Sequence, residues 1–322
     1  MRTQHKTTFT TSFEEDCYNG LTSYPKYLLS KYIYDQNGDK LFQDIMNLPE
    51  YYLTNCEYDI LKRHSAGIAE YMAGPEGFDL IELGAGDGKK TKVLLRYFAE
   101  KKVNFNYLPV DISESVLEEL EASLKSELPD VSVKIQQGTY FQTLEKLANF
   151  SSRKKVIMML GSNIGNLLHK DAINFLKNIS AAMSHEDMLF MGFDQKKNPQ
   201  TILDAYNDPT GVTAAFNKNQ LVRINRELGG NFDTDAFLHW ETYDPESGTA
   251  RSFLVSKIEQ TVAIEALGLE VHFDKWETIH TEISQKYDDR TVNWLAKEAN
   301  LKPIEFFTDE RNYYKNYIFM KE

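Results

Sequence analysis

The stretch Phe78–Lys92, FDLIELGAGDGKKTK, decides the fold of this chain. An apolar run opens it, a helical pattern begins at Thr91, and between them lie Gly84, Gly86 and Gly88. Strand, glycine turn and helix form the first unit of a doubly wound α/β sheet, which binds ligands at the carboxyl ends of its strands. Glycines tolerate positive φ and let the backbone approach a ligand closely. The stretch therefore predicts a ligand site at this turn, beside a helix N-terminus that favours negative groups.

The glycine spacing separates two classes of ligand. A dinucleotide fingerprint, Gly-x-Gly-x-x-Gly, requires a third glycine where this chain has Lys89. The observed Gly-x-Gly-x-Gly, with Glu82 two residues before it, resembles the pattern of class I S-adenosylmethionine (SAM) methyltransferases. Residues 105–110 read as the next strand and end in Asp111, an acid placed to accept ribose hydroxyls. The glycine loop alone also fits a tight turn in some other α/β protein, whereas Asp111 favours the cofactor interpretation.

Composition limits the class of protein. The 322 residues suffice for one large domain or a domain with a sizeable insertion. There is no apolar run long enough for a transmembrane helix and no secretory signal, so we expect a cytoplasmic protein with no membrane partner. The net charge of −12 argues against a nucleic-acid partner. Cys17 and Cys56 fit a reduced compartment, and neither cysteines nor histidines show metal-ligand spacing, so we expect no metal.

Strands and helices alternate after residue 78, which predicts a mostly parallel sheet with right-handed crossovers. We expect strands at 78–83, 105–110, 131–136, 155–160 and 188–193. Helices are expected between them, for example at 168–184 and, with Ser113 as N-cap, at 113–125. The chain ends with a helix near 288–299 and strands near 303–308 and 314–320.

The segment between these two parts breaks the alternation. It reads as helices at 198–207 and 211–228, followed by antiparallel strands within 236–284, which a doubly wound sheet does not need. We therefore expect an α/β, Rossmann-like class I SAM-methyltransferase fold with an inserted α+β lobe. The SAM-binding domain would comprise residues 62–196 plus 286–322, and the substrate-binding lobe residues 1–61 plus 197–285.

The N-terminal part carries two local signals. Asn37-Gly38 predicts a turn before a short helix. Thr54 and Glu57 have the spacing of a capping box, which predicts a helix from about residue 54 to Tyr71.

Several motifs in a fixed order resemble one known family, the histidine-specific SAM-dependent methyltransferases, which include the L-histidine Nα-methyltransferases of ergothioneine biosynthesis. The resemblance covers the chain from about Tyr34 to the end. Glycine loops are common, whereas the other motifs in this order are not. They are Tyr34-Asp35, Leu48-Pro-Glu-Tyr-Tyr52, Glu82-Leu-Gly84, Pro109-Val-Asp-Ile-Ser113, Leu160-Gly-Ser-Asn-Ile-Gly-Asn166, Asp204-Ala-Tyr206, Gly211-Val-Thr-Ala214 with Phe216-Asn217, and Thr281-Glu-Ile-Ser284.

The resemblance implies a role for each matching position. The substrate-binding set is Tyr51, Gly161, Asn166, Tyr206, Ser252, Glu282 and Ser284. Within it, Tyr51, Glu282 and Ser284 would hold the imidazole, and Asn166 and Tyr206 the α-amino acid head. Tyr34 and Asn166 would serve at the reacting amine. The cofactor set is Glu82, Gly84, Gly86, Gly88, Lys90, Asp111, Thr139 and Tyr140.

Two positions depart from the family pattern. Ser252 stands where better-known bacterial members carry a methionine near the imidazole, which puts the shape of the side-chain pocket in question. Thr139 and Tyr140 stand where many members place an aspartate by the adenine, which affects only the details of adenine binding.

The implied reaction is transfer of methyl groups from SAM to the α-amino group of L-histidine, with S-adenosylhomocysteine as product and hercynine as the trimethylated amino acid. Methyl transfer mainly requires alignment of two reactants. Glu282 and Ser284, two apart on a strand, would put both side chains on one face, where they can read two imidazole nitrogens. We expect a monomer with a small-molecule substrate.

Other interpretations remain for the chain and for single residues. The reaction could use another amino acid or small amine, or the protein could bind SAM without catalysis. An NAD-dependent oxidoreductase is disfavoured by Lys89. Tyr51 and Tyr206 could be packing aromatics, Asn166 could cap a helix starting near Leu167, and Glu282 could be a solvated surface residue.

Overall fold

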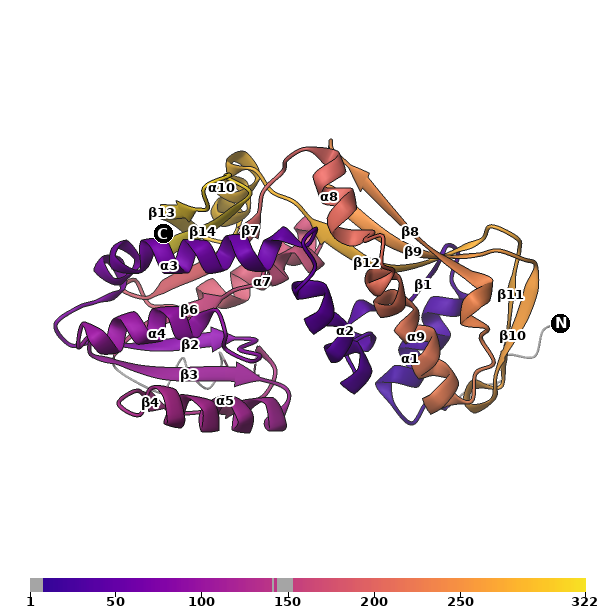
Figure 1. Ribbon diagram of the computed structural model, residues 1–322, viewed down its shortest axis with the longest axis horizontal. Helices are drawn as coiled ribbons and strands as arrows, with labels where there is room; N and C mark the ends of the chain where they lie inside the picture. The colour runs from indigo at the N-terminus through magenta and orange to yellow at the C-terminus, as the bar shows by residue number, and fades with distance from the viewer. Residues whose placement is uncertain (1–7, 141, 144–152) are drawn as a thin grey trace. The chain divides into compact units, whose positions relative to one another are not determined.

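The computed structural model describes residues 8–140, 142–143 and 153–322, and the chain divides into two compact units (Figure 1). Unit 1 comprises Met1–Tyr52 and Lys197–Ser284, and unit 2 comprises Leu53–Lys196 and Gln285–Glu322. The first division falls at residue 52 instead of the expected residue 61, because the long helix α3, Tyr52–Met72, lies almost wholly in unit 2.

Unit 2 is built on one mixed sheet with the strand order β13-β14-β7-β6-β2-β3-β4, and β5 also pairs with β3. Strands β2, β3, β4, β6 and β7 run parallel, whereas β14 pairs antiparallel with β7 and β13. The strands are β2 Phe78–Leu83, β3 Phe105–Asp111, β4 Ser132–Val133, β5 Gln136–Gln137, β6 Lys154–Met159, β7 Met188–Asp194, β13 Leu301–Thr308 and β14 Tyr314–Lys321. This order confirms the predicted doubly wound α/β sheet.

Helices cover both faces of this sheet because its central strands are apolar on both sides. Leu80 packs with α3, α4 and α5, whereas Ile81 and Leu83 pack with α7 and α10. The helices are α4 Thr91–Glu100, α5 Glu114–Glu127, α7 His169–Ala182 and α10 Asp289–Glu298, with the short helix η2 at Asn163–Asn166. The side chain of Ser113 caps α5 through the Val116 N–H, as predicted.

The predicted strand at 131–136 is wrong in its extent. The structure has two short strands, β4 and β5, separated at residues 134–135. Both pair with β3, and β4 lies at the end of the sheet. A strand with one neighbour has fewer ladder hydrogen bonds to hold it straight than a central strand has.

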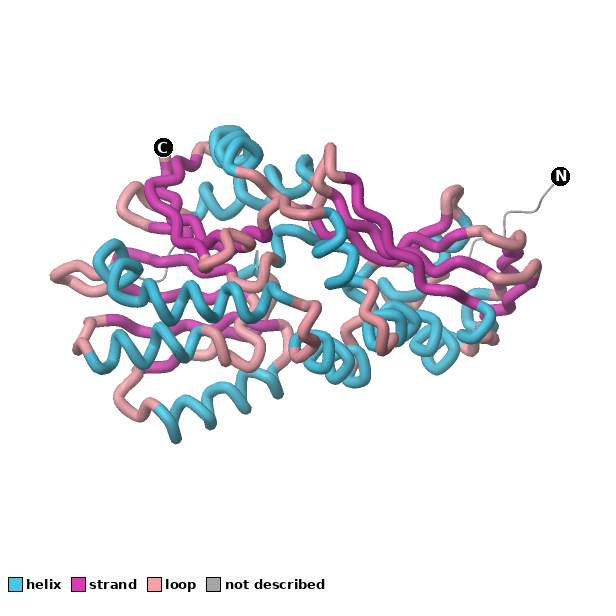
Figure 2. The backbone as a smooth tube through the Cα atoms, turned by 45° about the horizontal axis from the view of Figure 1, so that its top comes forward, coloured by secondary structure: helices cyan, strands magenta, loops and turns pink. Residues whose placement is uncertain are grey.

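Unit 1 combines helices with a second sheet of order β1-β12-β9-β8 and a separate β10–β11 hairpin (Figure 2). Helix α9, Val212–Leu228, packs against β8 and β9 in the core of this unit. The strands are β1 Lys26–Tyr27, β8 Phe237–Asp244, β9 Thr249–Ser256, β10 Gln260–Ile264, β11 Leu269–Phe273 and β12 Thr278–Gln285. The other helices are α1 Ser12–Thr22, η1 Ser30–Tyr32, α2 Gln36–Met46, α8 Pro199–Tyr206, η3 Thr234–Ala236 and η4 Glu265–Leu267.

The predicted helix from about residue 54 to Tyr71 is confirmed as α3, but two local details predicted for the N-terminal part, the turn and the capping box, are wrong. Asn37 and Gly38 do not form a turn before a helix but belong to the first turn of α2, where the Asp35 carboxylate accepts both of their N–H groups. Helix α3 begins at Tyr52, so Thr54 is not its N-cap. Glu57 does not complete a capping box. It is fully buried and forms hydrogen bonds to other elements of unit 2.

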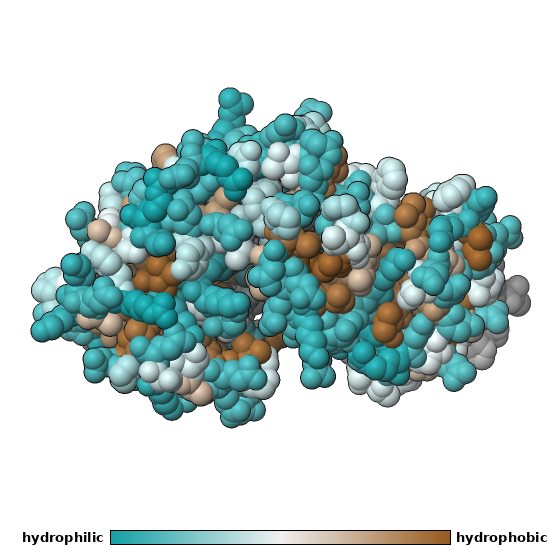
Figure 3. All heavy atoms as spheres, in the orientation of Figure 1, coloured by the Kyte–Doolittle hydropathy of each residue, from teal (hydrophilic) through white to brown (hydrophobic). Residues whose placement is uncertain are grey.

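The surface agrees with the acidic, polar composition. Hydrophilic side chains cover most of the face shown in Figure 3, with smaller hydrophobic patches between them. None of the helices in the described ranges combines the length and the apolar composition that a membrane-spanning helix requires.

His239 is a buried histidine in the core of unit 1. It lies on β8 opposite Leu254 of β9, and 6% of its surface is exposed. Burial lowers its pKa to about 4 from the usual 6.5, against the weaker opposing charge of Asp208. Its neutral form therefore stabilises the folded state above about pH 6.5, and this contribution is lost as the pH falls toward 4.

We expect His239→Leu to reduce the acid sensitivity of the fold. The free energy of unfolding of the wild type should fall by roughly 2 kcal/mol more than that of the variant between about pH 7 and pH 5, because the unfolded chain protonates this histidine first. Urea titrations at both pH values measure the difference. An equal loss of unfolding free energy in the two proteins would contradict the lowered pKa of His239.

Candidate functional site

The glycine turn of unit 2 connects β2 to α4. Gly84, Gly86 and Gly88 have φ values of +73°, +54° and +66°, which side-chain-bearing residues adopt only with strain. The N–H groups of Gly84 and Ala85 donate to the Val110 carbonyl at the end of β3, at 2.9 and 3.2 Å. A Cβ added at Gly86 would meet no atom within 4 Å. The turn therefore presents open backbone at its middle glycine.

Asp111 lies at the carboxyl end of β3, next to this turn. Its Oδ2 accepts the Gly86 N–H at 3.3 Å, and its Oδ1 accepts the Ser113 N–H at 3.0 Å. The side chain is half-buried. Each carboxylate oxygen has more than one acceptor position, so Asp111 can accept further hydrogen bonds from a ligand that lies against Gly86.

Glu82 supports the turn from the protein interior. It is buried, its Oε1 accepts the Thr91 hydroxyl at 2.5 Å, and its Oε2 accepts the Tyr107 hydroxyl. Burial raises its pKa to about 7, although both hydroxyl groups favour the ionised form. These contacts connect β2 to α4 and β3, so Glu82 fixes the geometry of the turn, and its role toward a cofactor stays a prediction.

Thr139 and Tyr140 follow Gly138, whose N–H donates to the backbone carbonyl of Asp111. The Tyr140 hydroxyl lies 2.6 Å from the position that a Cβ on Gly84 would take, so it occupies the space that this glycine leaves. Burial raises the Tyr140 pKa to about 12. Thr139 is exposed, and its Oγ1 accepts the Gln142 N–H at 3.4 Å. The structure thus places Tyr140 at the turn and Thr139 on the surface.

The loop after β6 has an unusual backbone. Gly161 and Ser162 both have positive φ, +80° and +57°, and such strain in a non-glycine residue often marks a functional site. Lys90, the residue before α4, forms a 2.5 Å ion pair with Glu57 and lies near Gly161. Asn166 ends η2 and is exposed, and since the N-cap of α7 is Leu168, Asn166 does not cap that helix.

An aromatic group in unit 1 brings together three tyrosines from separate segments. Tyr51 and Tyr206 are mostly buried and meet edge to face, with ring centroids 6.1 Å apart. Tyr34 packs on Phe216 of α9 at 5.4 Å, and Phe42 of α2 lies between Tyr34 and Tyr51. Aromatic contacts of this kind hold rings in fixed orientations, so the three tyrosine rings are part of one packed cluster.

Strand β12 adds polar groups to this cluster. Ser284 Oγ lies 2.8 Å from the Tyr206 hydroxyl. Loss of solvent, and after it the nearby Glu282 carboxylate, raises the pKa of Tyr34, although 36% of the surface of this residue is exposed. Tyr34 therefore stays protonated at neutral pH, and all three tyrosines can act as hydrogen-bonding groups beside Glu282.

Ser252 has a partner that the sequence analysis did not anticipate. It lies on β9 directly opposite Glu241 of β8, and its hydroxyl donates to Glu241 Oε2 at 2.6 Å, with both residues buried. The alternation of β8, which turns Phe237, His239 and Glu241 to the same buried face, is the signal that could have identified Glu241.

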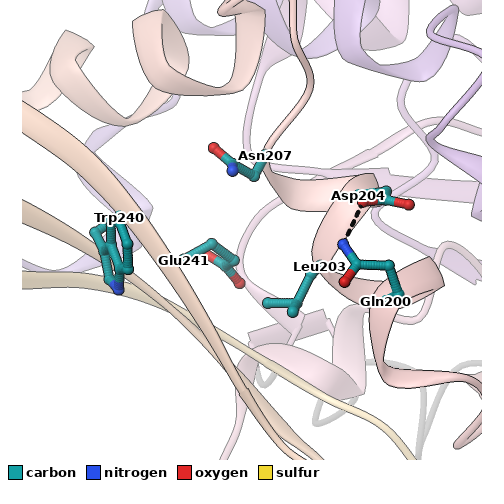
Figure 4. A pocket seen from close by; sticks show the side chains of 6 residues that line it. All are labelled: Gln200, Leu203, Asp204, Asn207, Trp240 and Glu241. Carbon is teal, nitrogen blue, oxygen red and sulfur yellow. Dashed lines mark hydrogen bonds between the residues drawn. The ribbon is translucent and has the colours of Figure 1, made fainter.

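Glu241 also borders a small cavity between α8 and β8 (Figure 4). In the figure, the Gln200 side chain is hydrogen-bonded to Asp204 on α8, and Leu203 lies near Glu241. The cavity measures about 210 Å³ and is also lined by Asn207 and Trp240. This is below the roughly 300–1,000 Å³ of typical ligand pockets, so the cavity is too small for a nucleoside cofactor.

The two groups of residues differ in what they can bind. The group in unit 2 offers open backbone, a carboxylate and an ammonium beside a helix N-terminus, which suits a nucleoside with a polar tail. The group in unit 1 offers hydroxyls and a carboxylate among aromatic rings, which suits a small polar substrate. In the described part of the chain, no group of three or more His, Cys, Asp or Glu side chains has an arrangement that could hold a metal ion.

Comparison with known proteins gives a consistent result. A family model described as histidine-specific, SAM-dependent methyltransferase matches residues 13–321. The chain is 35% identical to the histidine N-alpha-methyltransferase of Mycolicibacterium smegmatis, over 92% of this chain and 91% of that protein. It is 34% identical to the Mycobacterium tuberculosis protein of the same name, over 93% and 92%. It is also 31% identical to ergothioneine biosynthesis protein 1 of Schizosaccharomyces pombe, over 92% of this chain and 39% of that protein.

We expect Asp111→Ala to weaken binding of S-adenosylhomocysteine by about tenfold or more, because hydrogen bonds to a charged acceptor contribute ~1.5–3 kcal/mol. Asp111→Asn keeps an acceptor for the Gly86 N–H but loses the charge, so its effect should be smaller. Isothermal titration calorimetry measures both, with exposed Asp130→Ala as a control that should bind normally. Unchanged affinity in a folded Asp111→Ala variant would remove the ribose assignment.

Proposed function

The chain belongs to the histidine-specific SAM-dependent methyltransferase family, and we propose that it transfers methyl groups from SAM to the α-amino group of L-histidine. The proposed end product is trimethylated histidine, hercynine, an intermediate of ergothioneine biosynthesis. One observation carries the choice of histidine: Glu282 and Ser284 lie on the same strand beside three tyrosines, with Ser284 hydrogen-bonded to Tyr206. Similarity to histidine N-alpha-methyltransferases along nearly the whole chain supports it.

The cofactor is SAM, whose sulfonium supplies an activated methyl group for in-line displacement by an amine. We assign the ribose hydroxyls to Asp111 and the adenine side to Thr139 and Tyr140. The backbone of Gly84–Gly88 would lie against the cofactor, since Gly86 is open and its N–H is fixed by Asp111. Lys90 would hold the negatively charged carboxylate of the methionine part.

The attacking amine must be neutral. A site that excludes water disfavours the ammonium form and so lowers the pKa of the amine. Tyr34, held in its protonated form, can orient the amine through its hydroxyl without acting as a strong base. We assign the α-amino acid head to Asn166 and the Gly161 backbone in unit 2, and Tyr206 of unit 1 is assigned to the same part of the substrate. Catalysis would then come mainly from positioning, which can contribute roughly 7–11 kcal/mol.

The imidazole would be read by hydrogen bonds. Glu282 can accept the ring N–H as a charged partner, and Ser284 can bond to the second nitrogen, with Tyr51 packing alongside. Ser252 is small and its hydroxyl is already directed to Glu241, so the pocket near it would be roomier than a methionine would leave it. Weak methylation of larger amino acids is an expected side activity.

The proposal also covers the location, the oligomeric state and the partners of the protein. We propose that the protein acts in the cytoplasm as a monomer on a free amino acid. A net charge of −12 disfavours partners such as nucleic acids and anionic membranes.

Mass spectrometry of L-histidine incubated with the protein and SAM tests the activity. We expect mono-, di- and trimethylated histidine in succession. Methylation of a different amino acid in a competing mixture would favour the nearest alternative. Binding of SAM without any methylated product would favour a non-catalytic SAM-binding protein.

We expect Glu282→Ala to lower kcat/KM for histidine by about ten- to a thousandfold with SAM binding nearly intact, because an imidazole N–H loses its charged acceptor. Ser284→Ala should act in the same direction but more weakly, since a neutral hydroxyl is a poorer partner. Competition assays of histidine against phenylalanine and tryptophan measure the loss of discrimination.

Glu270→Ala provides the matched control, because Glu270 is an exposed glutamate on β11 of the same unit. It should leave kcat/KM unchanged. If Glu282→Ala methylates histidine as well as the wild type does, Glu282 does not read the imidazole and the choice of histidine loses its residue-level support.

A further inference from the structure

Glu57 is a fully buried carboxylate that receives donors from distant parts of unit 2. Its Oε1 accepts the Tyr314 hydroxyl at 3.1 Å and the Asn316 amide at 2.9 Å, both from β14. Its Oε2 accepts the Lys90 ammonium at 2.5 Å and the Gly161 N–H at 2.8 Å. One oxygen is thus anchored in the sheet, and the other reaches two groups at the carboxyl ends of the parallel strands.

The surrounding sheet is shaped to admit this side chain. Gly192 lies in the middle of β7, opposite Asn316 of β14. A Cβ at this position would lie 2.4 Å from Glu57 Oε1 and 2.3 Å from the Tyr314 hydroxyl, distances that atoms do not tolerate. A glycine in a strand interior weakens the strand, so the room it leaves for the carboxylate is its structural use here.

The two groups held by Oε2 belong to different parts of the proposed site. Lys90 follows the glycine turn and is assigned to the cofactor, whereas Gly161 begins the loop assigned to the amino acid head. A Cβ at Gly161 would lie 3.4 Å from Lys90 Nζ, so the two groups are close neighbours. Because a lysine side chain is flexible and an ammonium has no fixed geometry, the direction of Lys90 depends on its partner.

We propose that Glu57 is a positioning residue, which fixes the Lys90 ammonium and the Gly161 N–H through one shared carboxylate oxygen. This inference deepens the proposed function and rests on its assignment of Lys90 to the cofactor carboxylate. Glu57 touches neither reactant. Glu57 fixes the position of the Lys90 ammonium in the free protein, so that the cofactor does not have to order a mobile lysine side chain on binding.

A second buried carboxylate in the same unit provides a matched control. Asp187 is also fully buried and forms a 3.0 Å ion pair with Lys155. It accepts the N–H groups of Lys155 and Ser184, each at 2.7 Å. Asp187 directly precedes β7 and lies beside the start of β6, so it is at the amino ends of these strands. Gly161 lies beyond the carboxyl end of β6. Loss of its charge should therefore cost stability without disturbing Lys90.

The experiment compares Glu57→Gln with Asp187→Asn by calorimetric titration of S-adenosylhomocysteine and by thermal unfolding. Both variants should unfold at a lower temperature than the wild type. We expect Glu57→Gln alone to weaken binding, by about tenfold or more, since a charged hydrogen bond to Lys90 is lost. Asp187→Asn should bind within about twofold of the wild type. If Glu57→Gln does not fold, Glu57→Asp retains the charge but withdraws it from Lys90, and should also bind more weakly.

Lys90→Gln separates failure of this inference from failure of the proposed function. If Lys90→Gln binds S-adenosylhomocysteine normally, the cofactor assignment of Lys90 is wrong. If Lys90→Gln weakens binding while folded Glu57 variants bind as tightly as the wild type, or more tightly, the positioning role is overturned. Equal weakening by Asp187→Asn would also overturn it, because the effect would then be one of general stability. In the Lys90→Gln background, Glu57→Gln should add less than about a twofold change.

Discussion

The arrangement of unit 2 depends on how one buried negative charge, that of Glu57, is satisfied. A carboxylate removed from water costs several kcal/mol unless donors surround it. Here the donors come from β14, from the residue before α4 and from the loop after β6. Each of these segments is therefore held at a fixed distance from α3. A displacement of any one of them would leave a buried charge with an unfilled acceptor, so the carboxyl edge of the sheet is rigid where the candidate site requires rigidity.

The order of the strands brings parts of the candidate site together at this edge of the sheet. Because β2 lies between β3 and β6, the glycine turn, Asp111 and the Gly161 loop all emerge at neighbouring carboxyl ends. The chain adds β3 and β4 on one side of β2 and then crosses over to add β6 on the other side. Doubly wound proteins place their ligands at the point where the strand order reverses in this way. Unit 1 holds its polar groups by different interactions. Its hydroxyls are held by packed aromatic rings and by a strand, so they can recognise a small polar molecule by direction as well as by distance.

The sequence predicts most of the fold and only part of the site. The fold is indicated by patterns among neighbouring residues, whereas much of the site depends on residues that are far apart in the sequence. The glycine turn, the Ser113 cap and the alternation of strands are local patterns, and the structure confirms them. Glu57 fits a local pattern, the capping box, but its partners lie up to 259 residues away and no spacing in the sequence identifies them. The pairing of Ser252 with Glu241 likewise depends on the register of β8 and β9. The site roles of Tyr34, Asn166 and Glu282 stay predictions.

The short strand β1 has a consequence for how the chain acquires its structure during synthesis. Lys26 and Tyr27 pair with Ile279 and His280 of β12, and Lys26 also forms an ion pair with Glu277, 251 residues further along. At a ribosomal rate of ~5–20 residues per second, the N-terminal strand waits roughly 10–50 seconds for its partner to be made. During that interval β1 has no strand partner, so the sheet of unit 1 can be completed only after Thr278–Gln285 has been made.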